Sequence, residues 1–129
     1  MTVARDAPTP SGIVLPSLPY SPVIRSGDHV FTAGQVAHGA DGRVVSGGIA
    51  EQTTQVLANL RACLAAAACD LDDVQKVNVF LADLADFEAF NAVYREAFAA
   101  PYPARTTVQV GLPPGLLIEV EAVARLPGR

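Results

Sequence analysis

Charged residues are scarce in this sequence. They make up 17% of its 129 residues, against roughly 25% in an ordinary soluble domain. The formal net charge is −4, and the lysines and arginines form no cluster. A protein that binds nucleic acid neutralises phosphates with clustered basic side chains. The composition therefore argues against a nucleic-acid partner and, for the same reason, against binding to a membrane surface.

Cysteine is equally scarce, and this scarcity argues against disulfide bonds and against a zinc site. Cys63 and Cys69 are the only two, and both lie in one alanine-rich stretch. They are too few for a disulfide framework, and they form no CxxC or Cys/His pattern that would bind zinc. We expect no metal site and interpret both cysteines as small apolar residues.

Signals for export, membrane insertion and common catalytic motifs are missing as well. The N-terminus lacks a basic start followed by an apolar run, and no uncharged stretch approaches membrane-spanning length. There is no GxSxG, HExxH, GxGxxG or Walker loop. We therefore expect a cytoplasmic protein without these nucleotide- or zinc-dependent chemistries.

The abundant residues are apolar, at 50% of the chain. A chain of this length forms one domain with one core. A small monomer has a large surface to cover and normally needs more charge than this chain carries. We therefore expect another subunit to cover part of its surface.

Hydrophobic periodicity predicts the order of the elements. Residues 1–18 are rich in proline and are expected to be a loosely held arm, leaving 19–129 as the domain. Strands are predicted at 22–25, 29–36, 43–45, 74–81, 104–110 and 116–124, and helices over 49–68 and from Asp83 or Asp86 to about Ala97. The order β-β-β-α-β-α-β-β predicts an α/β (α+β) sandwich with two helices on one face of a mixed sheet.

The last predicted strand carries apolar residues on both faces. Ile118, Val120 and their alternate neighbours form one apolar face, while Leu117 and Val123 accompany two glutamates on the other. If the helices cover the first face, the second is too apolar to be left in water. This again predicts an oligomer.

Few side chains are able to perform chemistry. Lys76 is the only lysine and alternates with valines, which is typical of a strand residue with its ammonium in solvent. Arg105 begins a predicted strand, and Glu119 and Glu121 point to one side of another. By spacing alone, an exposed ion pair between Arg105 and a glutamate is the favoured interpretation. The functional alternative is that Arg105 binds a substrate carboxylate while a glutamate positions or activates a water molecule.

Several segments, in their order and spacing, resemble one known family. They are residues 19–21 (PYS), 31–35 (FTAGQ), 51–53 (EQT), 78–81 (NVFL), 90–94 (FNAVY), 103–108 (PARTTV) and 118–122 (IEVEA). From Pro19 to Ala124 the chain resembles the RidA/YjgF reactive-intermediate (enamine/imine) deaminases. The resemblance implies a chorismate-mutase-like fold, a homotrimer with sites between subunits, and hydrolysis of 2-imino or enamine acids to 2-keto acids and ammonia without a metal or organic cofactor.

The resemblance also implies roles for individual positions. Arg105 is expected to bind the substrate carboxylate and Glu119 to position the attacking water. Tyr20 is expected to line one side of the substrate pocket, and Asn91 is expected to lie at its edge. At Gly34 the backbone is expected to approach the ligand closely, and backbone groups near Thr107 are expected to contact it. Imine hydrolysis is not very slow in water, so positioning and charge complementarity suffice without a strong nucleophile.

Small substitutions separate this chain from many relatives and leave its substrate open. Ala33 stands where many have serine, Thr106 replaces a common serine, and Thr107 stands where some have cysteine. A deaminase of the 2-aminomuconate type is one alternative, and a non-catalytic trimer that binds a small carboxylate through Arg105 is another. Ribonuclease activity, assigned to some relatives, is disfavoured by the acidic charge and the lack of a basic groove.

Overall fold

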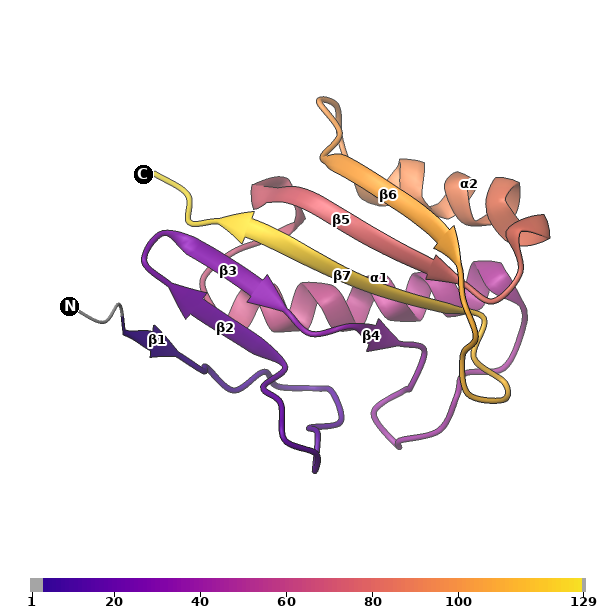
Figure 1. The fold of residues 1–129 in the computed structure, drawn as a ribbon, viewed down its shortest axis with the longest axis horizontal. Coiled ribbons are helices and arrows are strands. Elements are labelled where there is room, and N and C mark those ends of the chain that lie inside the picture. Colours follow the sequence, from indigo (N-terminus) through magenta and orange to yellow (C-terminus); the bar gives the residue numbers. More distant parts are fainter. Residues whose placement is uncertain (1–3, 129) are drawn as a thin grey trace.

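A mixed sheet forms the body of the molecule, with β5 and β7 adjacent at its centre (Figure 1). The structure, a computed structural model, describes residues 4–128. The strand order is β1-β2-β3-β7-β5-β6, and β4 also pairs with β7. β5 and β6 run parallel, and the other neighbours run antiparallel. The strands are β1 (Arg5–Asp6), β2 (Val23–Ser26), β3 (His29–Thr32), β4 (Gln35–Val36), β5 (Val74–Leu81), β6 (Ala104–Gln109) and β7 (Ile118–Arg125).

Two helices, α1 (Ile49–Ala66) and α2 (Phe87–Ala97), lie on one face of this sheet (Figure 1). One-turn 3₁₀ helices at Leu71–Asp73 and Leu84–Asp86 precede β5 and α2. The predicted fold class, two helices on one face of a mixed sheet, is thereby confirmed. Neither described helix is long and apolar enough to cross a membrane.

The helical periodicity seen in the sequence corresponds to the core. Val56, Leu60 and Leu64 of α1 have no exposed surface, because they face the buried valines of the sheet. α1 ends at Ala66, two residues before the predicted end, since Ala68 adopts a left-handed backbone with φ of 62°. At the start of α2, the Asp83 carboxylate accepts the Ala85 N–H at 2.9 Å and caps the preceding 3₁₀ turn.

Two predicted strands differ from the observed ones by more than one or two residues at their ends. The strand expected at 29–36 is interrupted, because the chain takes four steps from Phe31 to Gln35 while its partner β7 takes three from Val123 to Val120. This extra residue is a bulge at Ala33 and Gly34. No strand forms at 43–45, where a turn closed by the Gly39 N–H and the Arg43 carbonyl leaves one isolated bridge, His38 to Val44.

The N-terminal segment is partly joined to the sheet. We expected residues 1–18 to be a loose arm, yet Arg5 and Asp6 pair with Ser26 and Arg25 of β2. Residues 1–3 lie outside the described part of the chain.

The two faces of the sheet differ in composition. On the helix-covered face, Val77, Val79 and Val120 are completely buried. The open face carries polar pairs: Asn78 Nδ2 donates to Glu121 Oε2 at 3.1 Å, and Lys76 Nζ donates to Thr106 Oγ1 at 3.0 Å. It also exposes the apolar side chains Phe31, at 44%, and Val108, at 40%. In the isolated chain this open face therefore leaves apolar surface in water, as its sequence predicted.

Candidate active site

Arg105 lies on β6, the outermost strand of the sheet, and points to the helix-covered face. It pairs in register with Val77, whose side chain is in the core. Its guanidinium carbon lies 4.7 Å from the ring centre of Tyr94, 5.1 Å from Phe90 and 5.7 Å from Phe87, all on α2. Such cation–π contacts contribute about 0.5–2 kcal/mol each, more where water is excluded. The apolar stripe of α2 thus fixes the direction of the guanidinium.

A pocket of about 280 Å³ opens beside this arginine, lined by Asn91, Tyr94, Arg95, Tyr102 and Arg105. The predicted neighbours Asn91 and Arg105 are therefore brought together. The volume suits a small metabolite rather than a drug-sized ligand. No carboxylate lines the pocket, and no described carboxylate forms an ion pair with Arg105. Its guanidinium is available to bind an anion.

Three described hydroxyl groups are buried without a hydrogen-bond partner: those of Thr53, Tyr94 and Thr107. Tyr94, which is 4% exposed, and Thr107 are the two that belong to residues near Arg105. Burial raises the pKa of Tyr94, and both the positive charge of Arg105 and the polar interaction of its guanidinium with the Tyr94 hydroxyl partly offset the effect. Thr107 lies two residues after Arg105 on β6 and so shares its face. Buried polar groups in proteins are usually paired, and unpaired ones often mark sites that receive a ligand or water.

Glu119 lies on the opposite, open face. On β7 it pairs in register with Phe80 of β5 and Val36 of β4. Burial raises the pKa of its carboxyl group, and the negative charge of Glu121 raises it further. A carboxylate with a raised pKa is a better proton acceptor near neutral pH than an ordinary one. The raised pKa of Glu119 is a shift in the direction that suits a proton acceptor.

The bulge places Gly34 directly against Glu119. A Cβ atom at position 34 would lie 2.5 Å from Glu119 Oε2, so any larger residue would displace the carboxylate. Gly34 and Tyr20 together line a second pocket of about 150 Å³. Tyr20 is 53% exposed there. Gly34 therefore lies against Glu119 and also lines a pocket with Tyr20, although Glu119 is not among the residues that line that pocket.

Within one chain Arg105 and Glu119 do not meet. Arg105 points to the helix-covered face and Glu119 to the open face, and β5 lies between their strands. The ion pair between Arg105 and a glutamate that spacing alone favoured is therefore wrong. The sheet therefore separates the Arg105 guanidinium from the Glu119 carboxylate.

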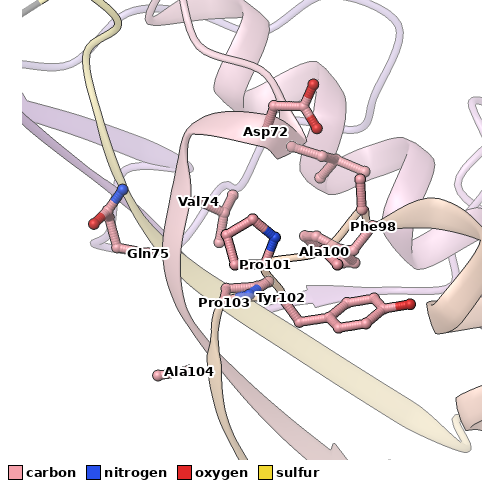
Figure 2. A pocket seen from close by; sticks show the side chains of 11 residues that line it. Asp72, Val74, Gln75, Phe98, Ala100, Pro101, Tyr102, Pro103 and Ala104 are labelled. Carbon is pink, nitrogen blue, oxygen red and sulfur yellow. The ribbon is translucent and has the colours of Figure 1, made fainter.

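A larger pocket of about 480 Å³ lies at the start of β5 and β6 (Figure 2). Val74, Phe98 and Pro101 supply apolar surface, and Asp72 is the only charged residue that lines it. Tyr102 lines both this pocket and the one beside Arg105. Asp72 and Tyr102 are the only titratable residues that line the larger pocket, and no basic or nucleophilic side chain accompanies them.

Sequence reasoning missed Arg95 and Tyr102 as lining residues of the Arg105 pocket. The signal for Arg95 was its position four residues after Asn91, because residues so spaced on a helix lie on one face. Tyr102 stands between Pro101 and Pro103, and nothing in the sequence alone indicated which way its ring points.

Metal and thiol chemistry find no support in the described residues. No group of three or more His, Cys, Asp or Glu side chains is gathered there. Cys63 and Cys69 are buried core residues, as expected. Burial raises the pKa of the Cys63 thiol to about 11, which leaves it protonated and unreactive at neutral pH.

Comparison with known proteins identifies the family of the chain. The chain is 46% identical over 122 residues to a RutC family protein of Pyrococcus horikoshii, covering 93% of this chain and 92% of that one. It is 42% identical over 108 residues to human 2-iminobutanoate/2-iminopropanoate deaminase, covering 82% and 79%. The crystal structure of Escherichia coli TdcF with bound serine superposes with a TM-score of 0.85 at 32% identity, covering 93% and 98%. The family model described as Endoribonuclease L-PSP matches residues 13–126, and the chain belongs to this family, the YjgF/RidA family.

Proposed function

We propose that this protein hydrolyses the imines, or the tautomeric enamines, of small 2-amino acids to 2-keto acids and ammonia. The observation that carries the proposal is the Arg105 guanidinium, held by three aromatic rings beside a small pocket that contains no carboxylate. A planar guanidinium binds a carboxylate through two parallel hydrogen bonds. The names of the human relative and of the serine-bound TdcF structure support a small α-amino carboxylic acid skeleton.

We further propose that the complete site lies between subunits of a homotrimer. One chain would supply Arg105, Asn91 and Thr107, and its neighbour would supply Tyr20, Gly34 and Glu119. Three observations support this assembly: the two groups lie on opposite faces of one sheet, the open face exposes apolar side chains, and the chain carries little charge. An assembly that covers the open face would remove Phe31 and Val108 from water.

The proposed reaction needs one water and no redox partner. Arg105 holds the substrate carboxylate, and Glu119 accepts a proton from the attacking water as its oxygen bonds to the imine carbon. The π electrons of the C=N bond move to the nitrogen, which takes up the proton that Glu119 accepted and gives a carbinolamine. The hydroxyl proton of the carbinolamine then passes to the amino nitrogen through Glu119, the C–N bond breaks, ammonia leaves and the carbonyl forms. Orientation of water and substrate supplies the catalysis.

A coupled assay tests the proposal. An amino-acid oxidase or a serine/threonine dehydratase generates short imino acids in place, and the release of keto acid is followed with wild type and with Arg105→Ala. Acceleration by wild type alone supports the deaminase. If wild type binds a 2-keto acid tightly yet accelerates no imine, the protein is a carboxylate-binding regulator instead, because binding requires the same arginine.

A further inference from the structure

We propose that the Arg105 pocket prefers imines that carry a second carboxylate on the side chain, as those derived from aspartate and glutamate do. Arg95 would bind this distal carboxylate. The inference rests on the proposed function and names the class of substrate for the same site.

Two cations share the pocket and no anion accompanies them. Of the nine lysines and arginines in the chain, two are among the five residues that line this pocket. In a chain with a net charge of −4, such an excess of positive charge is local. No described carboxylate forms an ion pair with Arg95 or Arg105. A monocarboxylic substrate neutralises one guanidinium, whereas a dicarboxylic substrate neutralises both.

The two arginines have different surroundings, which assigns them different roles. Arg105 is half-buried and fixed by the rings of Tyr94, Phe90 and Phe87. It is suited to the carboxylate next to the reacting carbon, whose position must be fixed. Arg95 is exposed in the last turn of α2, one residue after Tyr94. Its long side chain at the rim can reach a distal carboxylate on side chains of different length.

The other lining groups favour a polar side chain over a hydrocarbon one. Asn91 lies four residues before Arg95 on the same face of α2. Tyr102, from the loop before β6, is 50% exposed. Both carry neutral hydrogen-bonding groups, and neither adds a negative charge that would repel a dicarboxylate.

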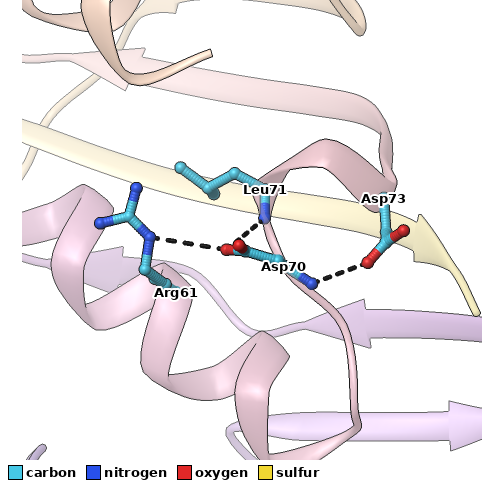
Figure 3. Close-up of polar contacts among 4 residues, drawn as sticks. All are labelled: Arg61, Asp70, Leu71 and Asp73. Carbon is cyan, nitrogen blue, oxygen red and sulfur yellow. Dashed lines mark hydrogen bonds and ion pairs between the residues drawn. The ribbon is translucent and has the colours of Figure 1, made fainter. Parts of the chain in front are cut away.

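The experiment compares dicarboxylic with monocarboxylic imines in wild type and Arg95→Gln. Glutamate and aspartate oxidases generate 2-iminoglutarate and 2-iminosuccinate, and an amino-acid oxidase acting on 2-aminobutyrate generates 2-iminobutanoate. Arg61→Gln is the matched control, since it removes the same charge from an exposed arginine on α1 whose partner is Asp70 at 3.6 Å (Figure 3). Such an exposed pair contributes little to stability.

We expect Arg95→Gln to lower kcat/KM by about fivefold or more on the two dicarboxylic imines, and by less than about twofold on 2-iminobutanoate, as for the loss of a rim charge. The wild-type preference for dicarboxylic imines should weaken with added salt, because an exposed charge is screened. Equal loss on all substrates, or the same change in Arg61→Gln, would overturn the inference. A change in stability alone would assign Arg95 to the helix C-terminus, where a cation is favourable.

Binding separates this inference from the proposed function. Calorimetry with 2-oxoglutarate and 2-oxobutanoate requires no turnover. Tighter binding of 2-oxoglutarate that is lost in Arg95→Gln supports the dicarboxylate preference even if no imine is hydrolysed. Hydrolysis of 2-iminobutanoate together with equal binding of both keto acids would leave the deaminase standing and refute the preference.

Discussion

The two faces of the sheet are formed by alternate residues of the same strands, but their side chains have different surroundings. On the helix-covered face, the buried valines of β5 and β7 pack against α1, and Arg105 emerges at the edge where the core ends. On the open face, Glu119 and Glu121 stand among polar pairs and exposed apolar side chains. The chain's own helices cover the first face, and they leave the second face open. The comparison indicates that folding requires one face, whereas the proposed activity requires both.

This division follows from the period of two in a strand. Since adjacent residues point to opposite faces, an arginine facing the helices on β6 and a glutamate facing away from them on β7 cannot meet across β5 in one sheet. A second chain that brings its open face to the edge at Arg105 would unite them.

Replacing Arg105 removes the anion-binding group of the helix-covered face. Arg105→Ala should lower kcat/KM by about a hundredfold or more, since loss of one partner of a desolvated, hydrogen-bonded charge pair costs roughly 2–5 kcal/mol. Steady-state kinetics on 2-iminobutanoate measure the effect, and an unchanged oligomeric mass confirms that the assembly survives. Full activity in this variant would contradict the assignment of Arg105.

Replacing Gly34 disturbs the open face without touching the core. In Gly34→Ala the new Cβ would overlap the Glu119 carboxylate, which must move. Misplacing a reacting group by about 1 Å lowers the rate by up to roughly a hundredfold. We therefore expect kcat to fall by between about tenfold and a hundredfold. The displaced atoms are the flexible end of a side chain, so the melting temperature should change little. A large loss of stability with normal kcat would contradict this role.

Replacing Gln52 should instead affect stability. This α1 residue is 2% exposed, donates to the Gly115 carbonyl at 2.8 Å and accepts the Leu117 N–H at 2.9 Å, so it holds the segment that leads into β7. Gln52→Ala leaves two backbone groups unpaired and should lower the free energy of unfolding by about 2–4 kcal/mol. Urea denaturation measures it, with Gln75→Ala, at an exposed site on β5, as a control that should lie within about 0.5 kcal/mol of wild type.

Replacing Glu121 tests the electrostatics of the open face. Its negative charge, together with the larger effect of burial, raises the pKa of Glu119. In Glu121→Gln the pKa of Glu119 should fall, so that Glu119 stays ionised to lower pH and the acidic limb of the kcat/KM profile moves toward lower pH. Because burial remains, we expect a shift below about one pH unit. A shift toward higher pH would contradict the assignment of Glu119 as the base.

The sequence predicted the elements well where a period extended over many residues. The strand at 74–81 and the start of the helix at Ile49 are observed at the predicted residues. Prediction failed where one residue changes the register. The bulge at Ala33 and Gly34 depends on how β3 and β4 pair with β7, and the length of a short turn decides that 43–45 forms no strand.

The candidate site was predictable in part for the same reason. The resemblance indicated Arg105, Glu119 and Gly34, and the structure places Gly34 against Glu119. Which face Arg105 occupies depends on the pairing of β6 with β5, which is a property of the sheet rather than of either segment. Arg95 and Tyr102 join Arg105 through tertiary packing, so no local pattern identified them together.

In the proposed assembly, one chain supplies Arg105 and its neighbour supplies Glu119. Arg105→Ala and Glu119→Gln, each inactive alone, are unfolded together in equal amounts and refolded into mixed oligomers. If each site draws the two residues from different chains, random mixing makes about one half times one half of the sites intact, roughly a quarter of wild-type activity. If one chain supplies both residues, every site lacks one of them. Recovery to about this level is the predicted result, and activity no higher than that of either variant alone would contradict the account.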